Sequence, residues 1–181
     1  MDSLSTTAVA PIRPPGRTAV RRIRPADAAR MRALRLEMLA DSPLAFLETV
    51  AEAAARPHPE FVARVVQACA GDHIARFVAD TGGRLVGHLG ALADPGDPTR
   101  TLIFAVYLSP AWRGSGLLAE LVEAAAAWSR AAGRPELMLE VVVGNDRALR
   151  AYQRLGFIDT GVRVPHPKIP VLTELQLLRP A

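Results

Sequence analysis

Apolar and polar residues along the chain follow first a helical and then a strand-like period. Between residues 27 and 40 the apolar side chains repeat close to helical spacing, at Met31, Leu34, Met38 and Leu39. From residue 73 onward the period changes: the runs "HIARFVAD" and "LVGHLGALAD" predict two strands, and the glycines of "TGGR" favour a turn between them. The next run, "TLIFAVYLS", is almost wholly apolar, which is typical of a strand covered on both faces.

Proline and glycine mark the limits of the remaining predicted elements. Pro25 ends a short strand and begins a helix, and Pro43 is expected to be the first residue of a second helix that continues to about Ala55. Gly133 and Gly156 end two later helices. The predicted order is a strand over 19–24, helices over 27–40, 43–55 and 60–70, strands over 73–80, 85–94 and 101–109, a helix over 117–132, a strand over 136–143, a helix over 145–155, and strands over 157–164 and 171–178.

Length and composition favour a soluble, single-domain protein. With 181 residues, 50% hydrophobic and 22% charged, the chain is long enough for one well-buried core, which we expect over residues 18–181. No apolar run approaches the ~20 residues of a membrane helix, so no membrane partner is expected. Residues 1–17 begin with an acidic residue and lack a continuous apolar core, which indicates a disordered tail and no export signal. The single cysteine, Cys69, fits a reducing cytoplasm.

The net charge of +4 comes almost wholly from arginine, since Lys168 is the only lysine. The flat guanidinium group suits phosphate binding. The arginines are spread along the chain, apart from a mild cluster at Arg21, Arg22 and Arg24, and no run interleaves them with aromatic residues as single-strand binders do. The charge therefore favours a small phosphorylated ligand and no nucleic acid partner.

Residues 113–118, "RGSGLL", separate the apolar strand from a long amphipathic helix. One interpretation is a plain turn, because glycine tolerates unusual backbone angles and serine caps helices. The other is an anion site, in which the free N–H groups of residues 114–119 face a phosphate at the helix start. The stretch lacks the lysine of a Walker loop, and Ala119 occupies the last place of the dinucleotide motif. Alone, it is a weak signal.

Three residues further along the chain could carry chemistry. Asn145 can cap the helix that contains Tyr152, and Tyr152 by itself is more simply explained as a half-buried packing residue. Glu140 stands in the apolar run "LMLEVVV". It lies either on the solvated face of an edge strand or in a partly dry cleft that raises its pKa, and only the second would make it a general base.

Taken together, "VYLSPAWRGSGLLAEL" and the later "NDRALRAYQRLGF" resemble the GNAT superfamily of acetyl-CoA-dependent N-acetyltransferases. The first stretch matches the family pattern Q/R-x-x-G-x-G/A, and the second matches Asn-x-x-Ala followed by Tyr and Gly-Phe. The resemblance covers about residues 20–178 and implies an α/β (α+β) fold, with a mixed, mostly antiparallel sheet of six to seven strands flanked by helices. The predicted order of elements agrees with it.

The resemblance also implies a role for each matching residue. The turn would hold the pyrophosphate of coenzyme A, and the end of the preceding strand would pair its backbone with the pantetheine arm. Asn145 would contact the cofactor arm and Tyr152 would protonate the departing thiolate. In the branch that acetylates protein N-termini, a glutamate twelve residues before the tyrosine is the base, and Glu140 has that spacing. The cofactor-binding residues implied are Val106, Tyr107, Leu108, Arg113, Gly114, Ser115, Gly116, Leu117, Leu118 and Asn145.

One position departs from the family pattern: Leu118 stands where Gly or Ala is usual. We expect its side chain to point into the core, so that its N–H still serves the phosphate site. If it points towards the cofactor instead, it would weaken cofactor binding.

The function implied is direct transfer of an acetyl group from acetyl-CoA to a primary amine of a small molecule, with no metal. The four histidines have no metal-binding spacing, and Cys69, in an apolar helix, is not expected to carry the acyl group. The base is either Glu140 or a water relay. Two alternatives remain: a protein N-terminal or lysine acetyltransferase, and a catalytically silent acyl-CoA-binding module. A homodimer formed through the last strands is left open.

Overall fold

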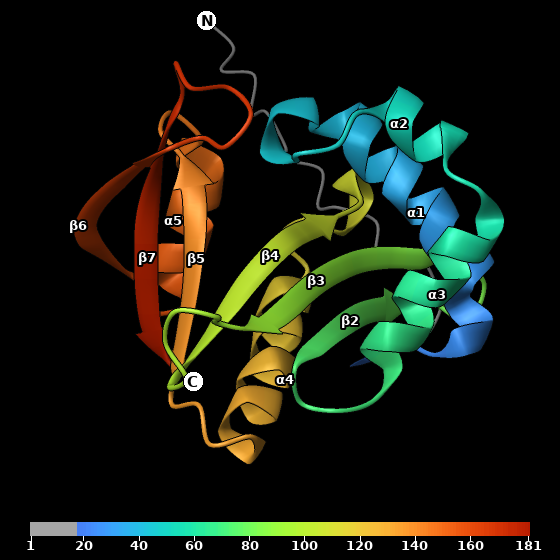
Figure 1. Ribbon diagram of the computed structural model, residues 1–181, viewed down its shortest axis with the longest axis horizontal. Helices are drawn as coiled ribbons and strands as arrows, with labels where there is room; N and C mark the ends of the chain where they lie inside the picture. Colours follow the sequence, from blue (N-terminus) through green and yellow to red (C-terminus); the bar gives the residue numbers. More distant parts are fainter. Residues whose placement is uncertain (1–17) are drawn as a thin grey trace, which may run out of the picture.

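The computed structural model describes residues 18–181, and the predicted tail over 1–17 lies outside them (Figure 1). The strands are β1 (Ala19–Arg22), β2 (Ile74–Asp80), β3 (Leu85–Ala93), β4 (Arg100–Leu108), β5 (Glu136–Val142), β6 (Ile158–Pro165) and β7 (Thr173–Pro180). The α-helices are α1 (Ala28–Asp41), α2 (Val50–Ala55), α3 (His58–Cys69), α4 (Leu117–Ala131) and α5 (Asp146–Arg154). Short 3-10 turns cover Pro25–Asp27, Pro43–Ala45 and Pro110–Trp112.

The seven strands form one sheet in the order β1-β2-β3-β4-β5-β7-β6. Every neighbouring pair is antiparallel except β4 and β5, which are parallel. This confirms the predicted mixed, mostly antiparallel sheet. The parallel pair is joined only over Arg100–Leu102 and Glu136–Met138, near the start of each strand. Beyond this point β4 and β5 diverge, as Figure 1 shows, and the sheet opens into a wedge.

Helices cover the two faces of the sheet and enclose two hydrophobic cores. On one face α4 packs over the sheet, around buried residues such as Leu121, Leu137 and Leu177. On the other face α1 and α3 pack around Met38, Val65 and Val78. Figure 1 shows α1, α2 and α3 in front of the sheet and α4 behind it. Within the described residues, no helix is both long and apolar enough to cross a membrane.

The predicted continuous helix from Pro43 to Ala55 is wrong, because the structure divides it in two. Pro43–Ala45 form a single 3-10 turn, and Phe46 then adopts extended backbone angles, with φ −137° and ψ 148°. The helix α2 starts anew after Thr49, whose N–H donates to Glu52 Oε2 (2.7 Å) while Glu52 N–H donates to Thr49 Oγ1 (3.2 Å). This reciprocal capping box favours a helix start at Val50.

The strand β4 contains a bulge that the apolar run did not indicate. His88 pairs with Tyr107 and Gly90 with Phe104, so two residues of β4 face one residue of β3, and Ala105 has a positive φ of 49°. Contrary to the prediction of a strand covered on both faces, Phe104, Ala105 and Val106 are only half-buried. Their neighbour β5 has already diverged, which leaves this part of β4 open to the wedge.

Candidate active site

Three hollows lie around the wedge between β4 and β5, and each shares lining residues with the next. The turn groove, of about 460 Å³, is lined by Val106, Tyr107, Leu108, Arg113, Gly114, Gly116, Leu118, Ala119, Arg147, Ala151, Tyr152, Arg154 and Leu155. The wedge channel, of about 110 Å³, is lined by Ala45, Ile103, Phe104, Ala105, Val106, Leu139, Glu140, Val141, Val142, Asn145, Ala148, Tyr152 and Glu174. The arginine cavity, of about 360 Å³, has as its polar lining Arg35, Glu48, Arg56, Arg64, Arg76, His88, Glu140, His166 and Glu174.

The turn between β4 and α4 presents backbone N–H groups to the turn groove. Gly114 (φ 76°) and Gly116 (φ 93°) adopt left-handed angles that glycine accepts at little cost. The N–H groups of Gly114, Gly116 and Leu118 have no backbone partner among residues 18–181. Those of Ser115 and Ala119 donate to the carbonyls of Trp112 (3.4 Å) and Gly116 (3.0 Å), so the prediction that all of 114–119 are free is only partly right.

The predicted turn residues divide into groove-lining and structural ones. Ser115 does not line the groove; its hydroxyl donates to the carbonyl of Trp112 at 2.6 Å and closes the turn. Leu117 is buried in the core beneath α4. Leu118 packs against the same core, as expected, but it also forms part of the groove wall, so each of the two positions considered for its side chain is partly right.

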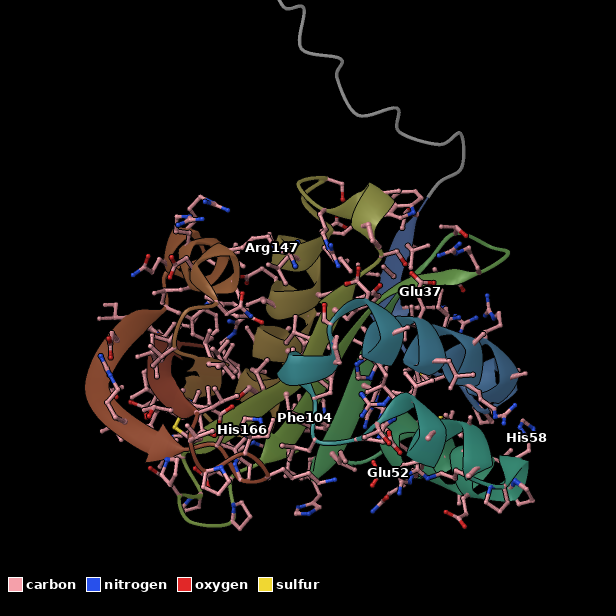
Figure 2. The ribbon with its side chains drawn as sticks, turned by 90° about the horizontal axis from the view of Figure 1, so that it is seen from above. Glu37, Glu52, His58, Phe104, Arg147 and His166 are labelled. Atoms are coloured by element: carbon pink, nitrogen blue, oxygen red, sulfur yellow. The ribbon has the colours of Figure 1, made fainter. Side chains whose placement is uncertain are left out.

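Arginines supply positive charge around the turn groove. The guanidinium of Arg113 pairs with Asp41 at the end of α1, and its Nε donates to the carbonyl of Leu108 at 3.2 Å. Arg147 and Arg154, both on α5, also line the groove, and Figure 2 shows Arg147 beside this helix. The motif comparison missed these two residues, because nothing in "NDRALRAYQR" distinguishes them from ordinary surface arginines.

Tyr152 connects the turn groove with the wedge channel, since it lines both. Its ring is 9% exposed and meets Phe157 edge to face, with ring centroids 5.7 Å apart. Burial raises the pKa of the phenol, so Tyr152 keeps its proton at neutral pH. Asn145 caps α5, as predicted, by accepting a hydrogen bond from the N–H of Ala148 at 3.2 Å, and it also lines the channel.

Two carboxylates occupy one face of the sheet beside the channel. Glu140 pairs with Gln176, and Val142 pairs with Glu174, so Glu140 and Glu174 point to the same face of β5 and β7. Glu140 is exposed. Burial, and secondly the charge of Glu140, raise the pKa of Glu174. Sequence reasoning missed Glu174, because in the alternating run "TELQLL" a charged residue on the face opposite the leucines is expected to be solvated.

Two buried histidines border the arginine cavity. The Nδ1 of His88 lies 2.7 Å from the carbonyl of Ala105, so Nδ1 carries the proton; burial lowers the pKa of this ring to about 3. The Nδ1 of His166 accepts hydrogen bonds from the N–H groups of Lys168 (3.2 Å) and Ile169 (3.0 Å). Residues 18–181 contain no group of three or more His, Cys, Asp or Glu side chains placed to hold a metal ion.

Comparison with solved structures shows the same fold. An acetyltransferase of the GNAT family from Streptococcus pneumoniae has a TM-score of 0.75 at 20% identity, over 91% of this chain and 99% of that one. A putative acetyltransferase from Salmonella typhimurium, solved with its cofactor acetyl-CoA, has a TM-score of 0.69 at 16% identity, over 90% of this chain and 93% of that one.

Sequence comparison gives the family. The chain is 29% identical over 119 residues to a mouse (Mus musculus) protein described as probable N-acetyltransferase family 8 member 5; the match covers 60% of this chain, and the chain spans about half (52%) of that relative. The model of the acetyltransferase (GNAT) family matches residues 38–157, a stretch that includes the turn, β5 and α5. The chain therefore belongs to the GNAT family of acetyltransferases.

Proposed function

We propose that this protein transfers an acetyl group from acetyl-CoA directly to a primary amine of a small molecule. One observation carries the proposal: the wedge channel, lined by Tyr152, Glu140 and Glu174, shares lining residues with the turn groove on one side and the arginine cavity on the other. A donor in the groove and an acceptor in the cavity would meet in this channel.

The residues of the turn groove fit coenzyme A. The unpaired N–H groups of Gly114, Gly116 and Leu118 at the start of α4 suit a pyrophosphate, and Arg147 and Arg154 add positive charge. Over residues 106–108, β4 pairs with β3 on one edge and has lost β5 on the other. Its peptide groups on the open edge are therefore available to the amide groups of the pantetheine arm.

The chain's own groups can move the two protons that the reaction requires. Acetyl-CoA supplies an acetyl thioester, which is activated towards attack by an amine. Tyr152 is protonated at neutral pH and can donate its proton to the departing sulfur. Glu174, with its raised pKa, can accept a proton from the incoming ammonium group, and Glu140 stands beside it.

Direct transfer is supported by the lining of the wedge channel, which contains no cysteine or serine to carry an acyl group. Cys69 lies on α3, where its thiol donates to the carbonyl of Val65 (3.0 Å) and burial raises its pKa. A raised thiol pKa disfavours the nucleophilic thiolate.

A small acceptor is supported by the walls of the arginine cavity. The segment around Phe46 and Leu47 lines one side, and His166 and Pro167, from the connection between β6 and β7, line another. A volume of about 360 Å³ lies within the range of small-ligand sites, whereas a peptide requires an extended groove.

The test is to mix purified protein with acetyl-CoA and a panel of amines and to measure the release of free thiol. The panel should include amino acids, polyamines, aminoglycosides and short peptides with free N-termini. We expect release with at least one small amine, faster than with any peptide. Coenzyme A binding without thiol release across the whole panel would instead support the catalytically silent module, and faster release with peptides would support the protein acetyltransferase.

A further inference from the structure

The arginine cavity separates its charges onto two walls. Arg35 on α1, Arg56 after α2, Arg64 on α3 and Arg76 on β2 line one side. On the opposite side of β4, Glu140 on β5 and Glu174 on β7 line the other. Such a cavity is complementary to a molecule that carries a positive charge at one end and a negative charge at the other.

Two of the four arginines already have a structural role. Glu48 accepts a hydrogen bond from Arg35 Nε at 2.9 Å and also pairs with the guanidinium of Arg56. Arg35 lies over the ring of Phe46, and Arg56 lies over the ring of Phe61. These contacts hold α1, α2 and α3 together. Among the described residues, neither Arg64 nor Arg76 forms an ion pair with Glu48.

Arg76 is the unexplained charge of this wall. Its side chain has neither an ion pair nor a hydrogen bond to any residue within 18–181, and its Nε is buried with no partner. Burial, followed by the like charges of Arg35 and Arg64, lowers its pKa to about 10, so it remains a cation at neutral pH. A shielded, unpaired cation is costly, and a bound anion would offset that cost.

The floor between the two walls is apolar. Arg76, Gly90 and Phe104 lie in register across β2, β3 and β4. A Cβ at Gly90 would come to 2.5 Å from Cζ of Phe104, so the ring packs directly against the backbone of β3 at this glycine. In Figure 2, Phe104 and His166 appear close together, and both border this cavity.

From this arrangement we infer that the acceptor is an amino acid: its carboxylate binds Arg76, and its amine faces Glu140 and Glu174 beside the wedge channel. The inference rests on the proposed acetyl transfer and specifies its substrate class. A polyamine would place a second cation against Arg76 and Arg64. The repulsion between these like charges excludes polyamines from the inferred substrate class.

The test compares each of a set of amino acids with its own carboxamide, using acetyl-CoA and thiol release. The two compounds differ only in the negative charge. We expect kcat/KM to be at least about tenfold higher for the acid than for the amide of the preferred pair. The amine of the amide is the weaker base, so a larger fraction of it is unprotonated and reactive at neutral pH. This difference favours the amide, so a higher kcat/KM for the acid cannot be caused by it.

Variants of Arg76 test whether this residue causes the preference for the acid over the amide. Arg76→Gln should lower kcat/KM for the acid by a much larger factor than for the amide, whereas Arg76→Lys should retain part of the preference. The matched control is Arg163→Gln on β6, an exposed arginine paired with Asp159 away from the cavity, which should change neither value. Thermal unfolding of each variant checks that the fold is intact.

Measurements on the wild-type protein are sufficient to overturn the inference, even if Arg76→Gln does not fold. Equal kcat/KM values for the acids and their amides would overturn it. Equal losses for acid and amide in a folded Arg76→Gln protein would also overturn it. The proposed function fails in a different way, by the absence of thiol release from every amine. In that case binding of the acids and amides to the coenzyme A complex, measured by calorimetry, still decides whether the cavity prefers a carboxylate.

Discussion

Burial raises the pKa of two side chains at the wedge channel, one suited to donate a proton and the other suited to accept one. It raises the pKa of Tyr152, which keeps the phenol protonated and able to donate. It also raises the pKa of Glu174, which makes this carboxylate a stronger base once it is ionised. A protonated phenol and a carboxylate of increased basicity beside one channel are suited to act as acid and base in the proposed transfer.

Replacing Tyr152 by phenylalanine tests the acid. The variant loses the hydroxyl but keeps the ring that packs on Phe157. We expect kcat to fall about 100-fold, because an acid of this kind contributes on that order, while the affinity for coenzyme A and the unfolding temperature stay nearly the same. Steady-state kinetics with binding calorimetry would measure both. Unchanged turnover would remove Tyr152 as the proton donor.

Replacing Glu140 by glutamine distinguishes the two carboxylates. The charge of Glu140 helps to raise the pKa of Glu174, so its removal lowers that pKa. If Glu174 is the base, kcat/KM should still rise with pH, but the rise should move to lower pH. The pH profile of the variant, with Glu123→Gln on α4 as control, measures this shift. Loss of the rise in Glu140→Gln would instead identify Glu140 as the base.

Motif comparison found the residues whose type is determined by the backbone conformation of their own short segment. Gly114 and Gly116 follow from the backbone of the turn, and Asn145 from the start of α5. Glu174 and Arg76 could not be found in this way, because each is one charged residue in an alternating strand. Only the pairing of β7 with β5 and of β2 with β3 shows which face they occupy.

At the scale of elements, the end of β4 and the turn after it create the site. The bulge at Ala105 and the early separation from β5 open this strand to both the groove and the cavity. The sequence predicted the position of β4 within a residue. It did not predict the bulge or the separation, since both depend on how β3 and β5 pair with it.

A pair of glycine substitutions tests the turn. Gly116 at the start of α4 and Gly133 after its end both have positive φ, 93° and 74°, with open space where a Cβ would be. Alanine at either position should therefore lower the free energy of unfolding by about 1 kcal/mol. Only Gly116→Ala should also weaken coenzyme A binding, because only this position lines the turn groove. Equal affinity in the two variants would contradict the proposed phosphate site.

At the scale of the whole molecule, a network of ion pairs joins β1, β2 and α1. The guanidinium of Arg21 donates to both oxygens of Asp27, at 2.7 and 2.9 Å, and also contacts Asp80. Arg30 pairs with the same two carboxylates. Asp27 is 1% exposed, and the hydrogen bond from Arg21 is the main reason that its pKa lies well below the usual range.

This network predicts how stability depends on pH. Because the folded pKa of Asp27 is depressed, its contribution is complete above the unfolded pKa and is lost as pH falls below about 4. Asp27→Asn should lower the free energy of unfolding by about 3 kcal/mol at pH 7 and flatten its fall in acid. Denaturant unfolding between pH 2 and pH 7 measures both effects. Asp159→Asn, at an exposed pair with Arg163, should change little; an equal loss there would contradict the special role of Asp27.

Several expectations concern the protein beyond the described residues or beyond one chain. The disordered tail over 1–17, the cytoplasmic location, the absence of a nucleic acid partner and the homodimer stay predictions. The single domain over 18–181 also stays a prediction, although all seven strands lie in one sheet.

The sequence by itself determined the order of elements and the family, because hydrophobic period, turn glycines and the two motifs act over short distances along the chain. It indicated the turn, Asn145 and Tyr152 for the same reason. The tertiary structure decided which charges line the same cavity. Arg76 and Glu174, which the sequence did not indicate, come from strands that are far apart in the chain, and the order of strands in the sheet, together with burial, places both beside the cavity that Glu140 also lines. These are properties of the folded chain, and no local pattern specifies them.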